Sequence, residues 1–220
     1  MIELELCVFK SFKIYQAKYG YRFSQEPFVL ADSIDLVNGN IVDFGTGTGI
    51  IPILLSLRNA NLNIYAVENN TEMLSVIKKN LQINNIKNVK IETDINNIKN
   101  NSMDCIVSNP PYFNKTNYRK SKKYFNEKFE SYDFKENIKM FKKILKNKGL
   151  LCFSYHPTRL AEAILNLNKH NFGIKSIQPV YGNIHKSASF VIIKAKLNGK
   201  NYINMEKAIY LDKDLTVSAI

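Results

Sequence analysis

The sequence predicts an α/β domain of the doubly wound, Rossmann-like type, with a mostly parallel sheet. Strand patterns alternate with helix patterns from residue 40 to residue 167, and a glycine-rich turn joins the first strand to the first helix. Alternation of this kind implies right-handed crossovers and a parallel sheet that is covered on both faces. The last two strand patterns are separated by a loop too short for a helical crossover, so the last strand is expected to be antiparallel to its neighbour.

The expected elements follow from hydrophobic spacing and from capping residues. Buried or alternating strands are predicted at residues 40–44, 63–68, 89–94, 103–108, 149–155, 174–181 and 187–197. Helices are predicted at residues 50–57, 71–81, 133–145 and 158–167, with Thr71 as the cap of the second. Residues 1–38 are expected to form a small N-terminal extension that packs on a core domain at 39–197. The pattern of the tail at 198–220 predicts no particular element.

The composition excludes several classes of protein. Of the 220 residues, 45% are hydrophobic and 23% are charged, which is typical of a folded globular chain. No apolar run is long enough to span a membrane, and the acidic, alternating start does not resemble a secretory signal, so we expect a cytoplasmic protein. Three widely spaced cysteines and three unpaired histidines predict neither a disulfide framework nor a metal site.

The positive charge is large and unevenly distributed. The formal net charge is +12, and residues 113–148 contain twelve Lys or Arg against four Asp or Glu. An AT-rich genome would enrich lysine throughout the chain, whereas this excess is local. A local basic excess favours nucleic-acid binding, although a solvated loop followed by an amphipathic helix face explains it about equally well.

A glycine-rich turn follows the first strand, in the sequence Asp43-Phe-Gly45-Thr46-Gly47-Thr-Gly49. In doubly wound folds, ligands lie beyond the carboxyl ends of the strands, and glycines allow a backbone to approach them closely. The third glycine stands one position early for a dinucleotide-binding turn, and Asp43 suits a cationic ligand better than a pyrophosphate. A turn without any ligand is the alternative.

Acidic residues end the next two predicted strands. Glu68 lies about 20 residues beyond the glycine turn, where a carboxylate can accept both hydroxyls of a ribose. Asp94 can accept a hydrogen bond from an adenine amino group, or it can simply begin a loop. Together with the glycine turn, these residues indicate a nucleoside-containing ligand.

The fourth predicted strand runs into Asn109-Pro110-Pro111-Tyr112. An exocyclic amine on an aromatic ring is a poor nucleophile because its lone pair is delocalised. The side-chain oxygen of Asn109 and the carbonyl of Pro110 can accept its hydrogens, while the prolines hold both acceptors in place. Tyr112 offers a face for stacking a planar base. A capped Pro-Pro turn explains the prolines but not the whole tetrapeptide.

In combination, these motifs resemble the class I S-adenosylmethionine-dependent methyltransferases that methylate amino groups. The resemblance covers roughly residues 20–197 and is strongest for the tRNA adenine-N6-methyltransferases that act beside the anticodon of a valine tRNA, through the block at 19–31 and the segment at 186–196. It implies S-adenosylmethionine as cofactor and a tRNA anticodon stem-loop as partner. The implied cofactor-site residues are Gln25, Phe28, Asp43, Gly45, Thr46, Gly47, Glu68 and Asp94. The implied holders of the target amine are Asn109, Pro110, Pro111 and Tyr112.

The family resemblance also gives the basic stretch a role. Contacts with RNA are then expected from Lys115, Arg119, Lys120, Lys122 and Lys123, with Tyr118 and Tyr124 between them. Phe190 either faces the target base or belongs to the core, and the core is favoured. We expect a monomer that needs no metal.

Other functions remain open at this point. The same tetrapeptide serves the methylation of a glutamine in release factors and of guanine in ribosomal RNA. Those relatives generally carry a separate recognition domain, for which the 38 residues before the core leave little room. A catalytically idle RNA-binding module is a third hypothesis, and an NAD-dependent enzyme is a distant fourth.

Overall fold

A computed structural model describes residues 3–19, 22–110 and 133–211. The strands are β1 (Leu4–Val8), β2 (Lys13–Ala17), β3 (Gly39–Phe44), β4 (Leu62–Val67), β5 (Val89–Glu92), β6 (Met103–Ser108), β7 (Leu145–Tyr155), β8 (Phe172–Tyr181), β9 (Ala188–Leu197), β10 (Asn204–Met205) and β11 (Ile209–Tyr210). The helices are α1 (Glu26–Asp32), α2 (Ile50–Arg58), α3 (Thr71–Ile83), α5 (Phe134–Ile144) and α6 (Leu160–Lys169), with short 3₁₀ turns η1 (Ile95–Asn97) and η3 (Pro157–Arg159).

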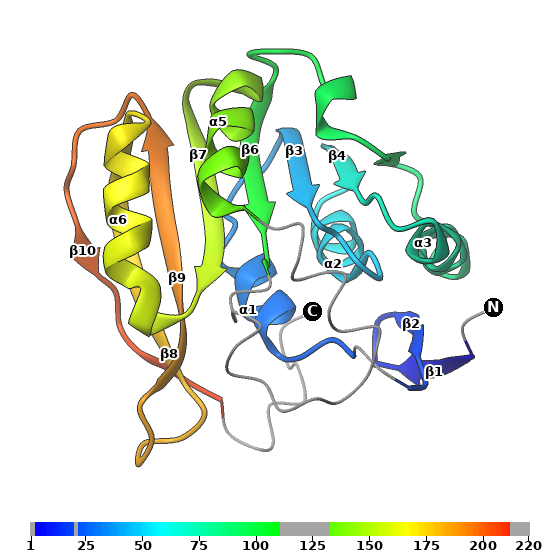
Figure 1. The fold of residues 1–220 in the computed structure, drawn as a ribbon. Helices are drawn as coiled ribbons and strands as arrows, with labels where there is room; N and C mark the ends of the chain where they lie inside the picture. Colours follow the sequence, from blue (N-terminus) through cyan, green and yellow to red (C-terminus); the bar gives the residue numbers. More distant parts are fainter. Residues whose placement is uncertain (1–2, 20–21, 111–132, 212–220) are drawn as a thin grey trace.

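The main sheet has the order β5-β4-β3-β6-β7-β9-β8, with β10 and β11 paired to the outer edge of β8. Strands β3 to β7 pair in parallel, and β9 is antiparallel to both of its neighbours. The predicted doubly wound sheet with an antiparallel last strand is therefore confirmed. From β3 the chain moves outward to β4 and β5 and then returns to β6 on the other side of β3. The carboxyl ends of these strands point to one edge of the sheet (Figure 1), and the reversal between β3 and β6 is where such folds bind ligands.

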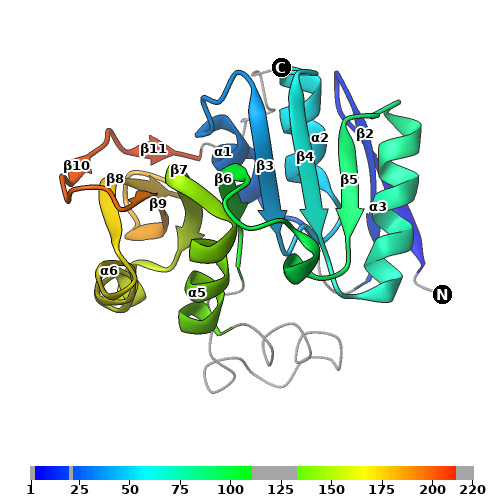
Figure 2. The same cartoon turned by 90° about the horizontal axis from the view of Figure 1, so that it is seen from above.

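Helices cover both faces of this sheet. Helices α5 and α6 lie on one face, whereas α1 and α2 pack against each other on the opposite face (Figures 1 and 2). Helix α3 flanks the β5 edge and contacts β2. Among the described residues, no helix is long and apolar enough to cross a membrane.

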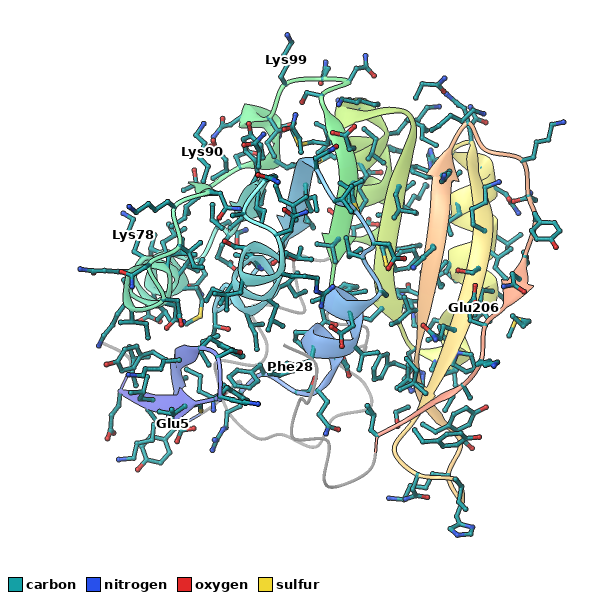
Figure 3. The ribbon with its side chains drawn as sticks, turned by 180° about the vertical axis from the view of Figure 1, so that it is seen from behind. Glu5, Phe28, Lys78, Lys90, Lys99 and Glu206 are labelled. Carbon is teal, nitrogen blue, oxygen red and sulfur yellow. The ribbon has the colours of Figure 1, made fainter. Side chains whose placement is uncertain are left out.

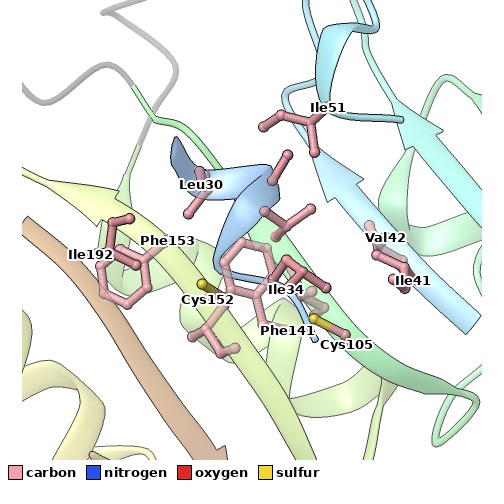
Figure 4. Packing of buried hydrophobic residues seen from close by; sticks show 14 of the residues in the cluster. Leu30, Ile34, Ile41, Val42, Ile51, Cys105, Phe141, Cys152, Phe153 and Ile192 are labelled. Carbon is pink, nitrogen blue, oxygen red and sulfur yellow. The ribbon is translucent and has the colours of Figure 1, made fainter. Parts of the chain in front are cut away.

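The hydrophobic core lies on both faces of the sheet, and Figure 4 shows the part around α1 and the central strands. Leu30 of α1, and Ile34 just after that helix, lie over Cys152 and Phe153 of β7. All three cysteines are free thiols, and burial raises the pKa of Cys152 to about 11. Such a thiol stays protonated at neutral pH and packs as a small apolar group. Phe190 is only 1% exposed on β9, which supports its assignment to the core.

The N-terminal hairpin of β1 and β2 is fastened to α3 by two asparagine side chains, one helical turn apart. The Tyr15 N–H donates to Asn80 Oδ1 at 2.7 Å, and Asn80 Nδ2 donates back to the Tyr15 carbonyl at 2.9 Å. Asn84 repeats the arrangement with the backbone of Lys13, at 2.8 and 2.6 Å. Each amide therefore pairs with the open edge of β2 as a neighbouring strand would.

One local expectation is wrong, and one segment without a prediction proves to form strands. Helix α3 is capped by Asn70 and not by Thr71, because the Asn70 side chain accepts the N–H groups of Glu72 and Met73 while its own backbone is extended. The segment after residue 197 also joins the sheet, since β10 and β11 pair in parallel with β8. Two-residue strands leave too little hydrophobic pattern to predict.

Candidate functional site

Four strand ends form one continuous row. Phe44 of β3 pairs with Val67 of β4 on one side and with Ser108 of β6 on the other. Ser108 in turn pairs with Phe153 of β7. The residues that follow the three parallel strand ends, Gly45, Glu68 and Asn109, are therefore neighbours, because paired strands lie about 4.8 Å apart. The structure thus brings the glycine turn, the acidic strand end and the Asn-Pro motif to one edge.

The glycine turn is bound to β4 and leaves open space in front of it. The N–H groups of Gly45 and Thr46 donate to the Val67 carbonyl at 3.0 and 3.1 Å. Gly45 has a φ of +76°, a conformation that side chains disfavour, and a Cβ added there would meet nothing within 4 Å. The backbone is therefore fixed while the volume beside it is free for a ligand.

Glu68 fastens the same turn from the end of β4. Its side chain is nearly buried, and its Oε2 accepts the Gly47 N–H at 2.9 Å while Oε1 accepts the Asn70 N–H at 3.0 Å. A carboxylate offers about four acceptor positions, so these two bonds leave capacity for two ribose hydroxyls. Glu68 thus holds the loop as well as being a candidate ligand residue.

Asp43 and Thr46 supply buried polar groups next to the turn. The Asp43 side chain is 1% exposed at the end of β3. The Thr46 hydroxyl is buried and has no hydrogen-bond partner among the described residues. A buried hydroxyl without a partner is unfavourable unless a ligand satisfies it. An unsatisfied hydroxyl, a buried carboxylate and the space beside Gly45 together fit a cationic nucleoside ligand.

Asp94 lies at the outer end of the row, beyond β5. It caps η1, accepting the Asn96 N–H at 2.8 Å and the Asn96 side-chain amide at 2.9 Å through Oδ1. The loop-starting role considered from the sequence is therefore present. The carboxylate remains exposed, so its predicted contact with an adenine amino group stays a prediction.

Asn109 follows β6 directly and is held by the neighbouring strand. The Ser154 hydroxyl donates to Asn109 Oδ1 at 2.5 Å, and Ser154 is completely buried on β7. The preceding Ser108 hydroxyl donates to the Phe44 carbonyl at 3.0 Å, which joins the ends of β6 and β3. Pro110 is buried beside Asn109. The remaining predicted residues of this region lie outside the described residues: Pro111, Tyr112, Lys115, Arg119, Lys120, Lys122 and Lys123.

The two upstream residues of the predicted cofactor site lie at the start of α1. Gln25 is exposed at the N-cap position and makes no side-chain capping bond. Phe28 is nearly buried and packs with Phe9, Phe12 and Phe23, with ring centroids 5.5 to 6.3 Å from its own (Figure 3). A contact of either residue with the cofactor stays a prediction.

Two residues have contacts at the site that the sequence does not predict. Ser154 is a polar residue inside an apolar strand pattern, which is itself a signal, but its partner is 45 positions away. Asn80 is completely buried on α3 and also donates to the Thr48 carbonyl at 2.9 Å, so it links the hairpin to the glycine turn. An asparagine on the predicted inner face of an otherwise amphipathic helix is the corresponding signal.

Residues 27–131 match the family described as methyltransferase small domain. The doubly wound fold, the row of motifs at the strand ends and this family match all indicate a methyltransferase. The chain belongs to the class I S-adenosylmethionine-dependent methyltransferases. S-adenosylmethionine is therefore the cofactor of this methyltransferase, as the family resemblance implies.

Its curated relatives act on different acceptors. The methyltransferase is 26% identical over 225 residues to the tRNA1(Val) (adenine(37)-N6)-methyltransferase of Pseudoalteromonas translucida, an alignment that covers 92% of this chain and 97% of the relative. It is also 26% identical over 181 residues to the release factor glutamine methyltransferase of Fusobacterium nucleatum, covering 76% of this chain. The chain spans half the length of that second relative.

Solved structures share the fold of this methyltransferase. A predicted O-methyltransferase from Agrobacterium tumefaciens superposes with a TM-score of 0.69 at 16% identity, covering 84% of this chain and 86% of that one. Identity at this level supports the fold and leaves the acceptor open.

Proposed function

We propose that this methyltransferase transfers a methyl group to the exocyclic N6 amine of an adenine in tRNA, next to the anticodon of a valine tRNA. The observation that supports methyl transfer to a nitrogen is the position of Asn109, which follows β6 one strand away from the glycine turn, and the choice of a tRNA adenine rests on the similarity to a tRNA methyltransferase. The alignment with the tRNA1(Val) enzyme extends over 92% of this chain, well beyond the methyltransferase core.

The cofactor half of the site has defined tasks in this proposal. When bound, S-adenosylmethionine supplies an electrophilic methyl group on a positively charged sulfur. Glu68 accepts the ribose hydroxyls with the acceptor positions that Gly47 and Asn70 leave free. Asp43 and the turn backbone hold the charged end, and Asp94 accepts from the adenine.

The acceptor half activates the amine by orientation. Asn109 Oδ1 and the Pro110 carbonyl each accept one amine hydrogen, which returns electron density to the nitrogen and directs its lone pair at the methyl carbon. Bound S-adenosylmethionine would supply the methyl group for the new N–C bond and would retain both electrons of the broken S–C bond on its sulfur, and the surplus amine proton would leave to solvent. No strong general base is required, because the methylated nitrogen is acidic until it loses that proton.

The proposed acceptor also suits the energetics of access. An adenine must leave its stack before its amine can reach a pocket at a strand end. In an anticodon loop it is already unpaired, so extrusion costs less than in a duplex. The tRNA-contacting role predicted for the basic stretch after Tyr112 is part of this proposal.

A protein glutamine is the second candidate acceptor. The relative from Fusobacterium nucleatum bears the name release factor glutamine methyltransferase, and its alignment covers 76% of this chain. A side-chain amide is also a delocalised nitrogen nucleophile, so the same two acceptors can orient it. The chemistry of Asn109 and Pro110 alone therefore does not distinguish the two substrates.

The test is methyl transfer from labelled S-adenosylmethionine, offered separately to unmodified tRNA, ribosomal RNA and release factor, with mass spectrometry of the digests. We expect N6-methyladenosine from tRNA alone. Label in glutamine or in ribosomal guanine would replace the proposed acceptor and keep the site. Cofactor binding without transfer to any of them would favour the idle RNA-binding module.

A further inference from the structure

We propose that Ser154 is the positioning residue that sets the rotation of the Asn109 amide and thereby the direction in which the acceptor half presents its oxygen. The inference rests on the proposed amine-orienting role of Asn109. It starts from one contact, the 2.5 Å hydrogen bond from the Ser154 hydroxyl to Asn109 Oδ1.

The position of Ser154 follows from the sheet register. Phe153 pairs with Ser108, so the next residue on each strand, Ser154 and Asn109, meet side by side where β6 ends. Ser154 itself stays inside the sheet, paired with Ile192 of β9, and is 0% exposed. The hydroxyl is therefore fixed by regular structure on both sides, whereas Asn109 has already left its strand.

The chemistry of an asparagine amide makes this bond consequential. The terminal torsion of asparagine is broad and nearly twofold, so an unrestrained amide rotates and exchanges its oxygen for its NH₂ group. If the NH₂ group of Asn109 took the position of its oxygen, it would repel the hydrogen of the target amine, whereas the oxygen attracts it. A carbonyl oxygen has two lone pairs, and the Ser154 bond uses one of them. The other then remains available in a fixed direction for the target amine.

The first experiment observes the amide directly and needs no acceptor substrate. In protein labelled with ¹⁵N-asparagine, the Asn109 side-chain signals are assigned by their loss in Asn109→Asp. We expect Ser154→Ala to shift or broaden that signal pair. Ser56→Ala is the matched control, because Ser56 is also a buried serine whose hydroxyl bonds an asparagine side chain, that of Asn88 in the loop before β5. It should alter the Asn88 signals and leave those of Asn109 unchanged.

The second experiment measures methyl transfer with the same variants. Ser154→Ala should lower kcat roughly ten- to hundredfold, the range expected for small misplacements of reacting groups, with KM for the acceptor and Kd for S-adenosylmethionine unchanged. Ser154→Cys keeps the shape of the side chain with a larger atom and a weaker donor, and its kcat should fall between those of the wild type and Ser154→Ala. In an Asn109→Ala background, the Ser154 substitution should have no further effect, because two residues acting through one contact are not additive.

The outcomes separate this inference from the proposed acceptor. An unchanged Asn109 signal in Ser154→Ala, or full turnover by that variant, overturns the positioning role even if tRNA is methylated. An altered signal supports the role even where another acceptor replaces tRNA. A loss of thermal stability equal to that of Ser56→Ala, with unchanged kcat, would make Ser154 merely structural.

Discussion

The two halves of the site are built differently. The cofactor half, at the ends of β3, β4 and β5, is held by several bonds that involve backbone groups, among them those from Gly45, Thr46 and Gly47. In the proposed acceptor half, at the ends of β6 and β7, the described residues present the Asn109 side chain, which is held by the Ser154 hydroxyl. Redundant backbone bonds make a surface that tolerates the loss of one contact. A single side-chain pair gives direction with little redundancy, so we expect graded effects in the first half and steep effects in the second.

The largest effect is expected from Asn109→Ala. It removes the side-chain acceptor for the amine, and we expect kcat to fall by about 100- to 1,000-fold, as for the loss of one preorganised polar group in other active sites. Cofactor affinity, measured by calorimetry, should stay within about twofold, because the glycine turn and Glu68 are untouched. An active Ala variant would contradict the orientation mechanism.

Glu68→Ala tests the cofactor half. It removes the acceptor of the Gly47 and Asn70 N–H groups together with the proposed ribose contacts. Hydrogen bonds to charged groups contribute about 1.5–3 kcal/mol, so Kd for S-adenosylmethionine should rise about 10- to 100-fold. At saturating cofactor, kcat should largely recover, unlike that of Asn109→Ala.

Glu72→Ala is the control for this prediction. Glu72 is an exposed carboxylate in the first turn of α3, four residues from Glu68. It should leave Kd nearly unchanged. Equal losses in both variants would indicate general electrostatic attraction of the cationic cofactor and not a specific contact.

Asn80→Ala probes what supports the cofactor half from behind. The change removes three bonds to the backbone of Tyr15 and Thr48 and leaves buried groups unsatisfied. We expect a loss of about 1–3 kcal/mol in the free energy of unfolding, measured by urea denaturation. The less buried Asn84 bonds the Lys13 backbone and does not reach the glycine turn, so Asn84→Ala should destabilise less and leave cofactor affinity unchanged.

The smallest effect concerns a group outside both halves. Burial lowers the pKa of His170, and the ammonium groups of Lys139, Lys142, Lys169 and Lys135 lower it further. As the pH falls, the imidazole of the unfolded chain is protonated near pH 6.5, at a higher pH than that of the folded chain. The free energy of unfolding therefore decreases as the pH falls below about 6.5.

Thermal unfolding between pH 7.5 and 5 checks this expectation. His170→Gln should flatten part of the decline, whereas substitution of the exposed His185 by Gln should not. Parallel curves for all three proteins would contradict it. His170 lies between α6 and the start of β8, at the edge of the sheet opposite the candidate site. Cofactor affinity should therefore follow the wild-type pH dependence in both variants.

Much of the fold was predictable because its signals are local. The apolar strand at Gly39–Phe44, the glycines that follow it and the amphipathic spacing of α3 each lie within a few residues. The sequence predicts Thr71 as the cap of α3 because threonine also caps helices well. Asn70 takes the position because the Glu68 carboxylate binds its N–H and fixes its backbone just before the helix begins.

The site was predictable in its residue types and strand ends, but not in its internal bonds. A parallel sheet with carboxyl ends at one edge is enough to bring Asp43, Glu68 and Asn109 together. That Glu68 binds the Gly47 backbone, across 21 positions, depends on the distance between β3 and β4 after packing. That distance cannot be derived from the spacing of residues along the sequence.

The sequence by itself determined the order of the elements between residues 39 and 197 and the strand ends at which the candidate site residues stand, because hydrophobic period and glycine conformation are properties of short segments. Only the tertiary structure decided that Ser154 holds Asn109, that Asn80 joins the hairpin to the glycine turn, and that the segment after residue 197 extends the sheet. Those contacts join residues 28 to 65 positions apart, and they exist only once strand register and helix packing have fixed which side chains meet.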